Sequence, residues 1–97
     1  MLTRAQRRFL RARAHDCKPV VRVGQRGVTA AVTAELDAAL DAHELVKVKL
    51  AGAGRDTRRA WVESLCAASG AESVQQIGAT ATLFRRNPER PRIELPD

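Results

Sequence analysis

The spacing of apolar residues predicts that helices and strands alternate along the chain. From Val28 to Leu40 a large apolar residue recurs at every fourth position, which is typical of one face of a helix. From Leu45 to Leu50 apolar residues alternate with two lysines, which is typical of a strand with one buried and one basic face. The patterns predict helices over residues 3–14, 29–43 and 56–69, and strands over residues 20–23, 45–50, 73–77 and 81–86.

Residues near the ends of the predicted helices indicate where each begins or stops. Thr3 and Gln6 have the spacing of a capping box, and Thr29 is the expected cap of the second helix. Asp56 is the expected cap of the third helix. That helix should end at Gly70, because glycine is common just beyond a helix C-terminus.

The resulting order, α-β-α-β-α-β-β, indicates an α/β fold. Two strands joined by a helix as long as residues 29–43 are expected to lie parallel, and the last two strands are expected to form an antiparallel hairpin. We therefore predict a two-layer domain in which helices pack on a mixed four-stranded sheet. A length of 97 residues suits a single domain over residues 1–97. Residues 87–97 hold three prolines and are expected to form an extended tail, with Ile93 and Leu95 packing back on the domain.

A glycine loop lies where the strand-like period gives way to the helical one. It reads Gly24-Gln25-Arg26-Gly27, and glycines at such a turn allow positive φ angles and the close approach of another backbone. The helix that follows is expected to direct free N–H groups and its positive dipole end toward this turn. KH domains hold a nucleic-acid backbone with a G-x-x-G loop. The alternative is a compact connection from strand to helix that binds nothing. We expect Gly27 to occupy a surface turn that accepts a larger side chain without unfolding.

The net charge of +6 is distributed unevenly along the chain. The first 26 residues hold eight basic residues against one acidic residue, whereas residues 27–97 hold nine against ten. This asymmetry is typical of a protein with a polyanion-binding face. Within the first helix, four arginines share one face and no acidic residue offsets them, so the face either binds a polyanion or serves only for solubility. These arginines are Arg4, Arg7, Arg8 and Arg11, and the expected apolar face is Leu2, Ala5, Phe9 and Ala12.

The same sequence argues against several classes of protein. No apolar run approaches the ~20 residues of a membrane span, and the Arg-rich start lacks the apolar core of a signal peptide. Cys17 and Cys66 lie far apart without a C-x-x-C pattern, which favours reduced thiols in the cytoplasm. His15 lies next but one to Cys17, but no further ligands follow at a metal-binding spacing, so no metal or cofactor is expected.

A ribonuclease that uses His15 and His43 as acid and base is the catalytic alternative. Both imidazoles would have to reach one phosphate. His43 ends the second helix, and about fourteen residues at ~1.5 Å each place it on the order of 20 Å from the glycine loop. We therefore expect no enzymatic activity, and expect His43 to interact with the C-terminus of its helix.

Four segments in the same order resemble the CRM domain (chloroplast RNA splicing and ribosome maturation), in its bacterial single-domain YhbY-type form. They are Lys18-Pro19-Val20-Val21, the glycine loop, His43 to Lys49, and Ile77-Gly78 leading to Leu83-Phe84-Arg85. The resemblance implies a fold similar to the C-terminal domain of translation initiation factor 3. It also implies that the glycine loop contacts RNA and that the protein associates with precursors of the large ribosomal subunit. Phe84 stands where the family often has tyrosine, and residues 78–81 lack a basic residue often found there, so no RNA contact is carried over to that turn.

The sequence thus predicts a monomeric, cytoplasmic protein that binds ribosomal RNA during large-subunit assembly. A DNA-binding or protein-docking module that uses the same basic face is the alternative, because charge alone does not identify the partner. Three aromatic residues are present, and Phe9 and Trp61 are expected in the core, so RNA should be recognised by shape rather than by base stacking. The predicted RNA-binding residues are Gly24, Gln25, Arg26, Gly27, Lys18, Arg22, Arg4, Arg7, Arg8 and Arg11, with Lys47 and Lys49 on the basic strand face.

Overall fold

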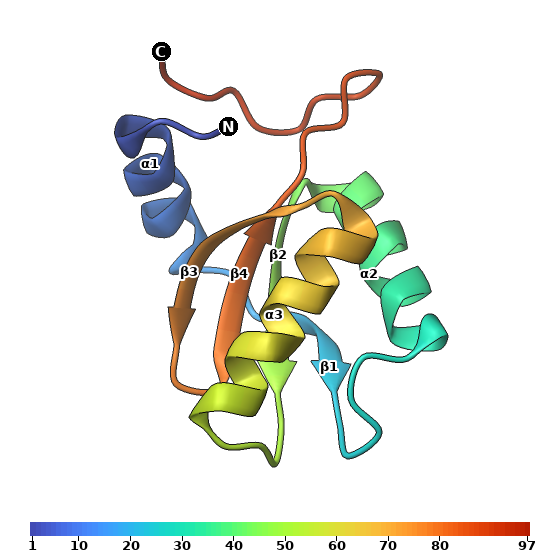
Figure 1. The fold of residues 1–97 in the computed structure, drawn as a ribbon. Coiled ribbons are helices and arrows are strands. Elements are labelled where there is room, and N and C mark those ends of the chain that lie inside the picture. Colours follow the sequence, from blue (N-terminus) through green and yellow to red (C-terminus); the bar gives the residue numbers. More distant parts are fainter.

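The computed structural model describes residues 1–97 as three helices and a four-stranded sheet (Figure 1). The α/β class and the order of elements agree with the prediction. The last strand ends before Arg85, and the tail, residues 87–97, forms no helix or strand. The elements are α1 (Arg4–Ala14), β1 (Pro19–Val23), α2 (Ala30–His43), β2 (Leu45–Leu50), α3 (Arg55–Ser69), β3 (Glu72–Ile77) and β4 (Thr80–Phe84).

Side-chain caps set the starts of α1 and α2. The N–H of Gln6 donates to Oγ1 of Thr3 at 3.1 Å, and the N–H of Thr3 donates to Oε1 of Gln6 at 3.0 Å. At α2 the N–H of Val32 donates to Oγ1 of Thr29 at 3.2 Å. Both caps confirm the predictions, because each occupies N–H groups that have no partner within their helix.

The start of α3 differs from the prediction, whereas its end agrees. Gly54 is the N-cap and makes no side-chain hydrogen bond, so Asp56 is not the cap. It lies in the first turn, where the helix dipole favours a negative charge. Gly70 ends the helix in the left-handed region, with φ of +76°.

The sheet is mixed, as predicted, with the strand order β1-β2-β4-β3. β1 and β2 are parallel, and the pairs β2–β4 and β3–β4 are antiparallel. The parallel register places Arg22 beside Lys49, and it is irregular at Val20, between Pro19 and Val21. This arrangement brings the C-terminal ends of β1 and β2 and the β3–β4 turn to one edge of the sheet (Figure 1). Two backbone bonds join this edge, from the Ala51 N–H to the Val23 carbonyl at 2.9 Å and from the Leu50 N–H to the Ala79 carbonyl at 2.7 Å.

One face of the sheet is covered by α2 and α3, which bury the larger of two hydrophobic clusters. The cluster holds every second residue of β2, consistent with the predicted alternation. Half-buried Trp61 packs against its margin, as predicted for a core residue rather than a base-stacking one. The buried members include Val21, Val23, Leu36, Leu40, Val46, Val48, Leu50, Val62, Leu65 and Leu83.

α1 packs on the opposite face of the sheet, so the helices do not all lie in one layer as the two-layer prediction supposed. Leu10 and Ala14 point inward and are at most 1% exposed. Ala5 and Ala12, predicted on the apolar face, are exposed instead. The physical reason is that burying Leu10 removes far more apolar surface from water than burying an alanine does. The helix is therefore turned about its axis so that the face with Leu10 meets the sheet. The second cluster contains Leu10, Ala14, Leu45, Val74, Phe84 and Ile93, with Leu95 packed against it.

The tail is held by Glu44, a buried carboxylate that the sequence did not single out. Its side chain is fully buried and accepts the N–H groups of Asn87, Arg92 and Ile93 at 2.6, 2.7 and 2.8 Å. Burial by itself would raise the pKa of Glu44, but these hydrogen bonds, with the charge of Arg86, hold it below the ordinary value. Ile93 therefore reaches the core, as predicted, because the carboxylate fixes the backbone at Ile93 and at the residue before it.

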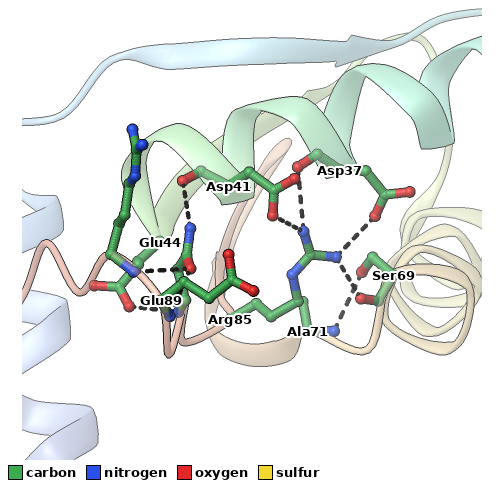
Figure 2. A network of polar contacts seen from close by, with 9 residues as sticks. Asp37, Asp41, Glu44, Ser69, Ala71, Arg85 and Glu89 are labelled. Atoms are coloured by element: carbon green, nitrogen blue, oxygen red, sulfur yellow. Dashed lines mark hydrogen bonds and ion pairs between the residues drawn. The ribbon is translucent and has the colours of Figure 1, made fainter.

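A second polar cluster joins α2 to the end of β4 (Figure 2). The guanidinium of Arg85 donates to the carboxylates of Asp37 and Asp41 at 2.8 and 2.9 Å, and to the carbonyl of Ser69 at 2.7 Å. Arg85 is therefore a structural residue. The two aspartates that it neutralises lie on α2, away from the glycine loop.

Candidate nucleic-acid interface

The glycine loop forms a tight turn at the C-terminal end of β1. The N–H of Gly27 donates to the carbonyl of Gly24 at 2.9 Å, which closes a four-residue turn. Gln25 and Arg26 form its exposed tip, and the two glycines are half-buried. Gly27 has φ of +72°, a conformation that glycine adopts without steric cost.

Trp61 of α3 lies directly behind this turn. A Cβ atom at Gly27 would lie 3.2 Å from Nε1 of Trp61, whereas a Cβ atom at Gly24 would meet nothing within 4 Å. The Gly27 position is therefore less open to a larger side chain than the sequence suggested. Both the positive φ and the neighbouring indole disfavour a side chain at Gly27, whereas Gly24 has room for one.

α2 begins at Ala30, three residues after the last glycine of the loop. Val28 and Thr29 intervene, and the side chain of Thr29 already accepts the N–H of Val32. The N–H groups of Ala30 and Ala31 donate to no acceptor in the protein. The helix thus retains free donors at this end, as expected of a helix N-terminus.

The basic residues of β1 and β2 lie on the face of the sheet opposite α2 and α3. Arg22 and Lys49 are register partners on neighbouring strands, and both are exposed. Lys47, two residues before Lys49, is half-buried on the same face. None of the three forms an ion pair within the protein. The predicted basic strand face is therefore present, and its charges are unneutralised.

Three of the four arginines predicted to share one face of α1 are exposed and unpaired, namely Arg4, Arg8 and Arg11. Arg7 is the exception. Its guanidinium donates to the carbonyl of Ser73 and to Oε2 of Glu72, the latter at 3.3 Å. It already has partners in β3, because its position on the helix turns it toward the sheet. Of the four predicted arginines, Arg7 is therefore the one whose charge is already paired within the fold.

A hollow of about 260 Å³ separates the C-terminal end of α1 from the open face of the sheet. We call it the sheet hollow. It brings together Arg11 of α1 and Lys47 of β2, two residues that the sequence predicted separately. His15 and the side chains of Gln75, Thr80 and Thr82 also line it, and no carboxylate does. Cations beside hydroxyl and amide groups are suited to bind phosphate and sugar oxygens.

A second hollow, of about 440 Å³, lies among the end of α1, the start of β1, the end of α2 and the tail. We call it the tail hollow. Lys18, predicted to bind RNA, lines it together with Lys47, Arg13, Arg92 and His43. No acidic residue lines this hollow either, whereas the hollow beside Asp41 and Asn87 also contains Glu89. The sequence did not predict Arg92 as part of this surface, because it is remote from the other basic residues along the chain. The hydrogen bond of its N–H to Glu44 brings it to the hollow.

The sequence analysis also missed three arginines at the start of α3, namely Arg55, Arg58 and Arg59. None forms an ion pair, and the Nε of Arg58 is buried without a hydrogen-bond partner. They lie at the same edge of the sheet as the glycine loop, since Trp61 of the same helix packs against that loop. The sequence did contain a signal for them. Positive charges near a helix N-terminus interact unfavourably with the helix dipole, so three arginines in this place suggest a role outside the helix.

The remaining features do not add a metal or a reactive thiol to this surface. No group of three or more His, Cys, Asp or Glu residues is placed to hold a metal ion. Both cysteines are free. Burial, together with the charge of Glu72, raises the pKa of the Cys66 thiol, so it stays protonated at neutral pH. None of the helices is both long and apolar enough to cross a membrane.

Comparison with known proteins supports the resemblance described above. Residues 2–85 match the model of the CRS1 / YhbY (CRM) domain. A Pseudomonas aeruginosa protein named "Probable RNA-binding protein PA4753" is 48% identical over 88 residues, covering 91% of this chain and 85% of its own. A Haemophilus influenzae protein named "RNA-binding protein" is 41% identical over 95 residues, covering 98% and 95%.

A solved structure shares the fold. The solution structure of SAV1595 from Staphylococcus aureus, for which RNA binding is proposed, matches with a TM-score of 0.85 and 34% sequence identity. The match covers 99% of this chain and all of SAV1595. The arrangement of helices and strands is therefore that of a known fold.

Proposed function

The chain belongs to the CRS1/YhbY (CRM) domain family, and from this premise we propose that it is an RNA-binding protein without catalytic activity. The observation that carries the proposal is a set of cations that form no ion pair with an acidic residue. This set extends over α1, the open face of the sheet and the glycine loop. Such a surface attracts a phosphate backbone and releases its counterions. The proposed contact residues are Arg4, Arg8, Arg11, Lys18, Arg22, Gln25, Arg26, Lys47 and Lys49, with the backbone of Gly24 and Gly27.

The glycine loop is proposed to hold one phosphate of the RNA backbone. Its exposed tip carries Arg26, and the free N–H groups of Ala30 and Ala31 follow closely in sequence. An anion is stabilised at such a place by the helix dipole and by direct donors. Trp61 lies behind the loop and favours a preformed conformation, which would reduce the conformational entropy lost when RNA binds.

The RNA is proposed to be ribosomal, in a precursor of the large subunit, and the protein to act as a cytoplasmic monomer in assembly. The family resemblance supports this part of the proposal, since charge does not distinguish one RNA from another. No cofactor is needed for such a role, because the contacts are between side chains or backbone donors and phosphate.

Crosslinking in growing cells tests the proposed target. The protein is crosslinked to RNA by ultraviolet light, and the attached fragments are sequenced. We expect the reads to concentrate in a few segments of large-subunit ribosomal RNA. A variant with Arg4, Arg8 and Arg11 changed to Gln is the matched control, and it should lose most of the signal. Reads spread evenly over messenger RNAs would contradict the assembly role, and no recovered RNA would contradict RNA binding altogether.

A further inference from the structure

We propose that the tail hollow receives the base of one unpaired nucleotide, so that the protein prefers structured RNA that carries an extruded nucleotide. This inference rests on the proposed RNA-binding function and extends it to a specific feature of the RNA. The hollow measures about 440 Å³, within the range of pockets that enclose small-molecule ligands.

The floor and wall of the tail hollow are apolar, as a base requires. Leu45, Val46 and Ile93 line it and are themselves buried, so they present a packed surface rather than mobile side chains. Val20 adds an exposed wall, with 54% of its surface accessible at the irregularity between β1 and β2. An exposed β-branched residue beside this floor contributes nothing to the core, but it offers contact to a flat ring.

The rim of the tail hollow is cationic, and its charges come from four separate parts of the chain. Arg13 belongs to α1, Lys18 to the segment before β1, Lys47 to β2 and Arg92 to the tail. No carboxylate faces them within the hollow. An apolar floor inside a ring of cations complements a nucleotide, in which a flat base is joined to a charged phosphate.

His43 supplies the one aromatic ring in this lining and is exposed at the end of α2. Unstacked RNA bases commonly stack on histidine rings and on the planes of arginine guanidinium groups. His43, Arg13 and Arg92 are therefore the groups suited to cover the base. The backbone of Arg92 is held by Glu44, whose carboxylate accepts its N–H at 2.7 Å, so this side of the hollow is preformed.

The hollow is continuous with the surface proposed to bind the RNA backbone. Lys47 lines both the sheet hollow and the tail hollow. An RNA held by Arg11 and Lys47 would therefore have its next nucleotides beside Lys18 and Arg92. This continuity favours RNA over an acidic peptide as the occupant.

Three RNA hairpins of the same stem test the inference: one fully paired, one with a single bulged adenosine, and one with an abasic nucleotide at the bulge. Affinities are measured by fluorescence anisotropy at one salt concentration. We expect the adenosine bulge to bind at least about fivefold tighter than the other two, because stacking of one base contributes on the order of 1–3 kcal/mol. The abasic hairpin separates capture of the base from the flexibility of a bulged backbone.

Two pairs of variants locate the effect. Ala42→Glu places a carboxylate in the tail hollow, and Ala38→Glu places the same group one turn earlier on α2, outside it. Arg92→Gln removes a rim charge, and Arg90→Gln removes a charge of the tail that does not line the hollow. All four positions are exposed, so the fold should tolerate each change. Ala42→Glu and Arg92→Gln should abolish the preference for the adenosine bulge, and Ala38→Glu and Arg90→Gln should keep it.

The outcomes separate the two proposals. Equal binding of the three hairpins, or an abasic bulge that binds as well as adenosine, would overturn base capture and leave RNA binding intact. A preference that survives in Ala42→Glu and Arg92→Gln would also overturn it and leave the tail hollow to another partner, such as an acidic peptide. Failure of the wild-type protein to bind any of the hairpins would overturn both proposals.

Discussion

The indole nitrogen of Trp61 lies against Gly27, where a Cβ atom would come within 3.2 Å of it. This contact joins the glycine loop after β1 to α3, through two residues that are more than thirty positions apart in sequence. It makes the loop part of the packed structure rather than a free surface turn. The two glycines of the loop therefore have different roles, and the roles can be separated by mutation.

The first prediction concerns these two glycines. Gly24→Asp should leave the urea midpoint of unfolding nearly unchanged, because a Cβ atom there meets nothing within 4 Å, and it should weaken RNA binding by placing a negative charge beside the phosphate. Gly27→Asp should also destabilise the fold, by about 1–2 kcal/mol for the left-handed backbone alone. Gly24→Ala is the uncharged control. A folded Gly24→Asp protein with wild-type affinity would show that the loop does not hold a phosphate.

A second prediction uses Trp61 as a reporter, since it is the only tryptophan in the chain. RNA bound at the glycine loop should change its fluorescence emission, because the half-buried ring is in contact with that loop. The change should follow the same titration curve as anisotropy of labelled RNA, and Gly24→Asp should reduce it. Saturating RNA with no change in emission would place the RNA away from the loop.

The exposed arginines of α1 give a third prediction. Changing Arg4, Arg8 and Arg11 to Gln should lower the slope of log affinity against log salt by about 2.7, at ~0.9 per phosphate of a duplex. A variant with Arg86 and Arg90 changed to Gln removes charge from outside the proposed surface and should keep the wild-type slope. An unchanged slope in the α1 variant would mean that these arginines serve only for solubility.

The fourth prediction concerns Glu44, whose carboxyl pKa lies below its ordinary value of 4.5 in the folded protein. A carboxylate whose pKa is lower in the folded state stabilises the fold fully when the pH is above its pKa in the unfolded state. This stability is lost as the pH falls through its pKa in the folded state. The wild-type free energy of unfolding should therefore decline below about pH 4.5. Glu44→Gln should lose about 1–3 kcal/mol at neutral pH and show a shallower acid decline. Exposed Glu89→Gln is the control in urea unfolding from pH 3 to 7, and identical pH profiles for wild type and Glu44→Gln would contradict this role.

A fifth prediction concerns the form of the RNA. The surface offers many cations but few rings, so it should bind a folded ribosomal RNA hairpin tighter than an unstructured strand of equal length. A single captured base adds to this preference without reversing it, because one stacking contact is small beside several phosphate contacts. Equal or tighter binding of the unstructured strand at the same salt concentration would contradict shape recognition.

The sequence by itself determined the order of the elements, their approximate bounds and the family. These are local properties: the apolar period of β2, the capping box at Thr3 and the glycine at residue 70 each act over a few neighbouring residues. The exposed position of Arg4, Arg8 and Arg11 was also predictable, because four arginines on one helix face without a nearby acid cannot all be buried.

Only the tertiary structure decided which residues around these elements have partners. The sequence placed Arg7 with the other arginines of α1, but Glu72 and the carbonyl of Ser73 hold it at the sheet. Likewise, no residue near Gly27 in the sequence indicates that Trp61 packs against it. Both contacts join residues that are distant along the chain, and periodicity carries no information about such pairs.

The tail shows the same limit most clearly. Its apolar Ile93 predicted that it would pack back on the domain, but not where. The position follows from Glu44, which is buried at a helix end with φ of +62° and accepts three N–H groups of the tail. A buried carboxylate is stable only when hydrogen bonds replace its water, so the tail must pass beside Glu44, where α2 ends and β2 begins. Arg92 is thereby placed at the tail hollow.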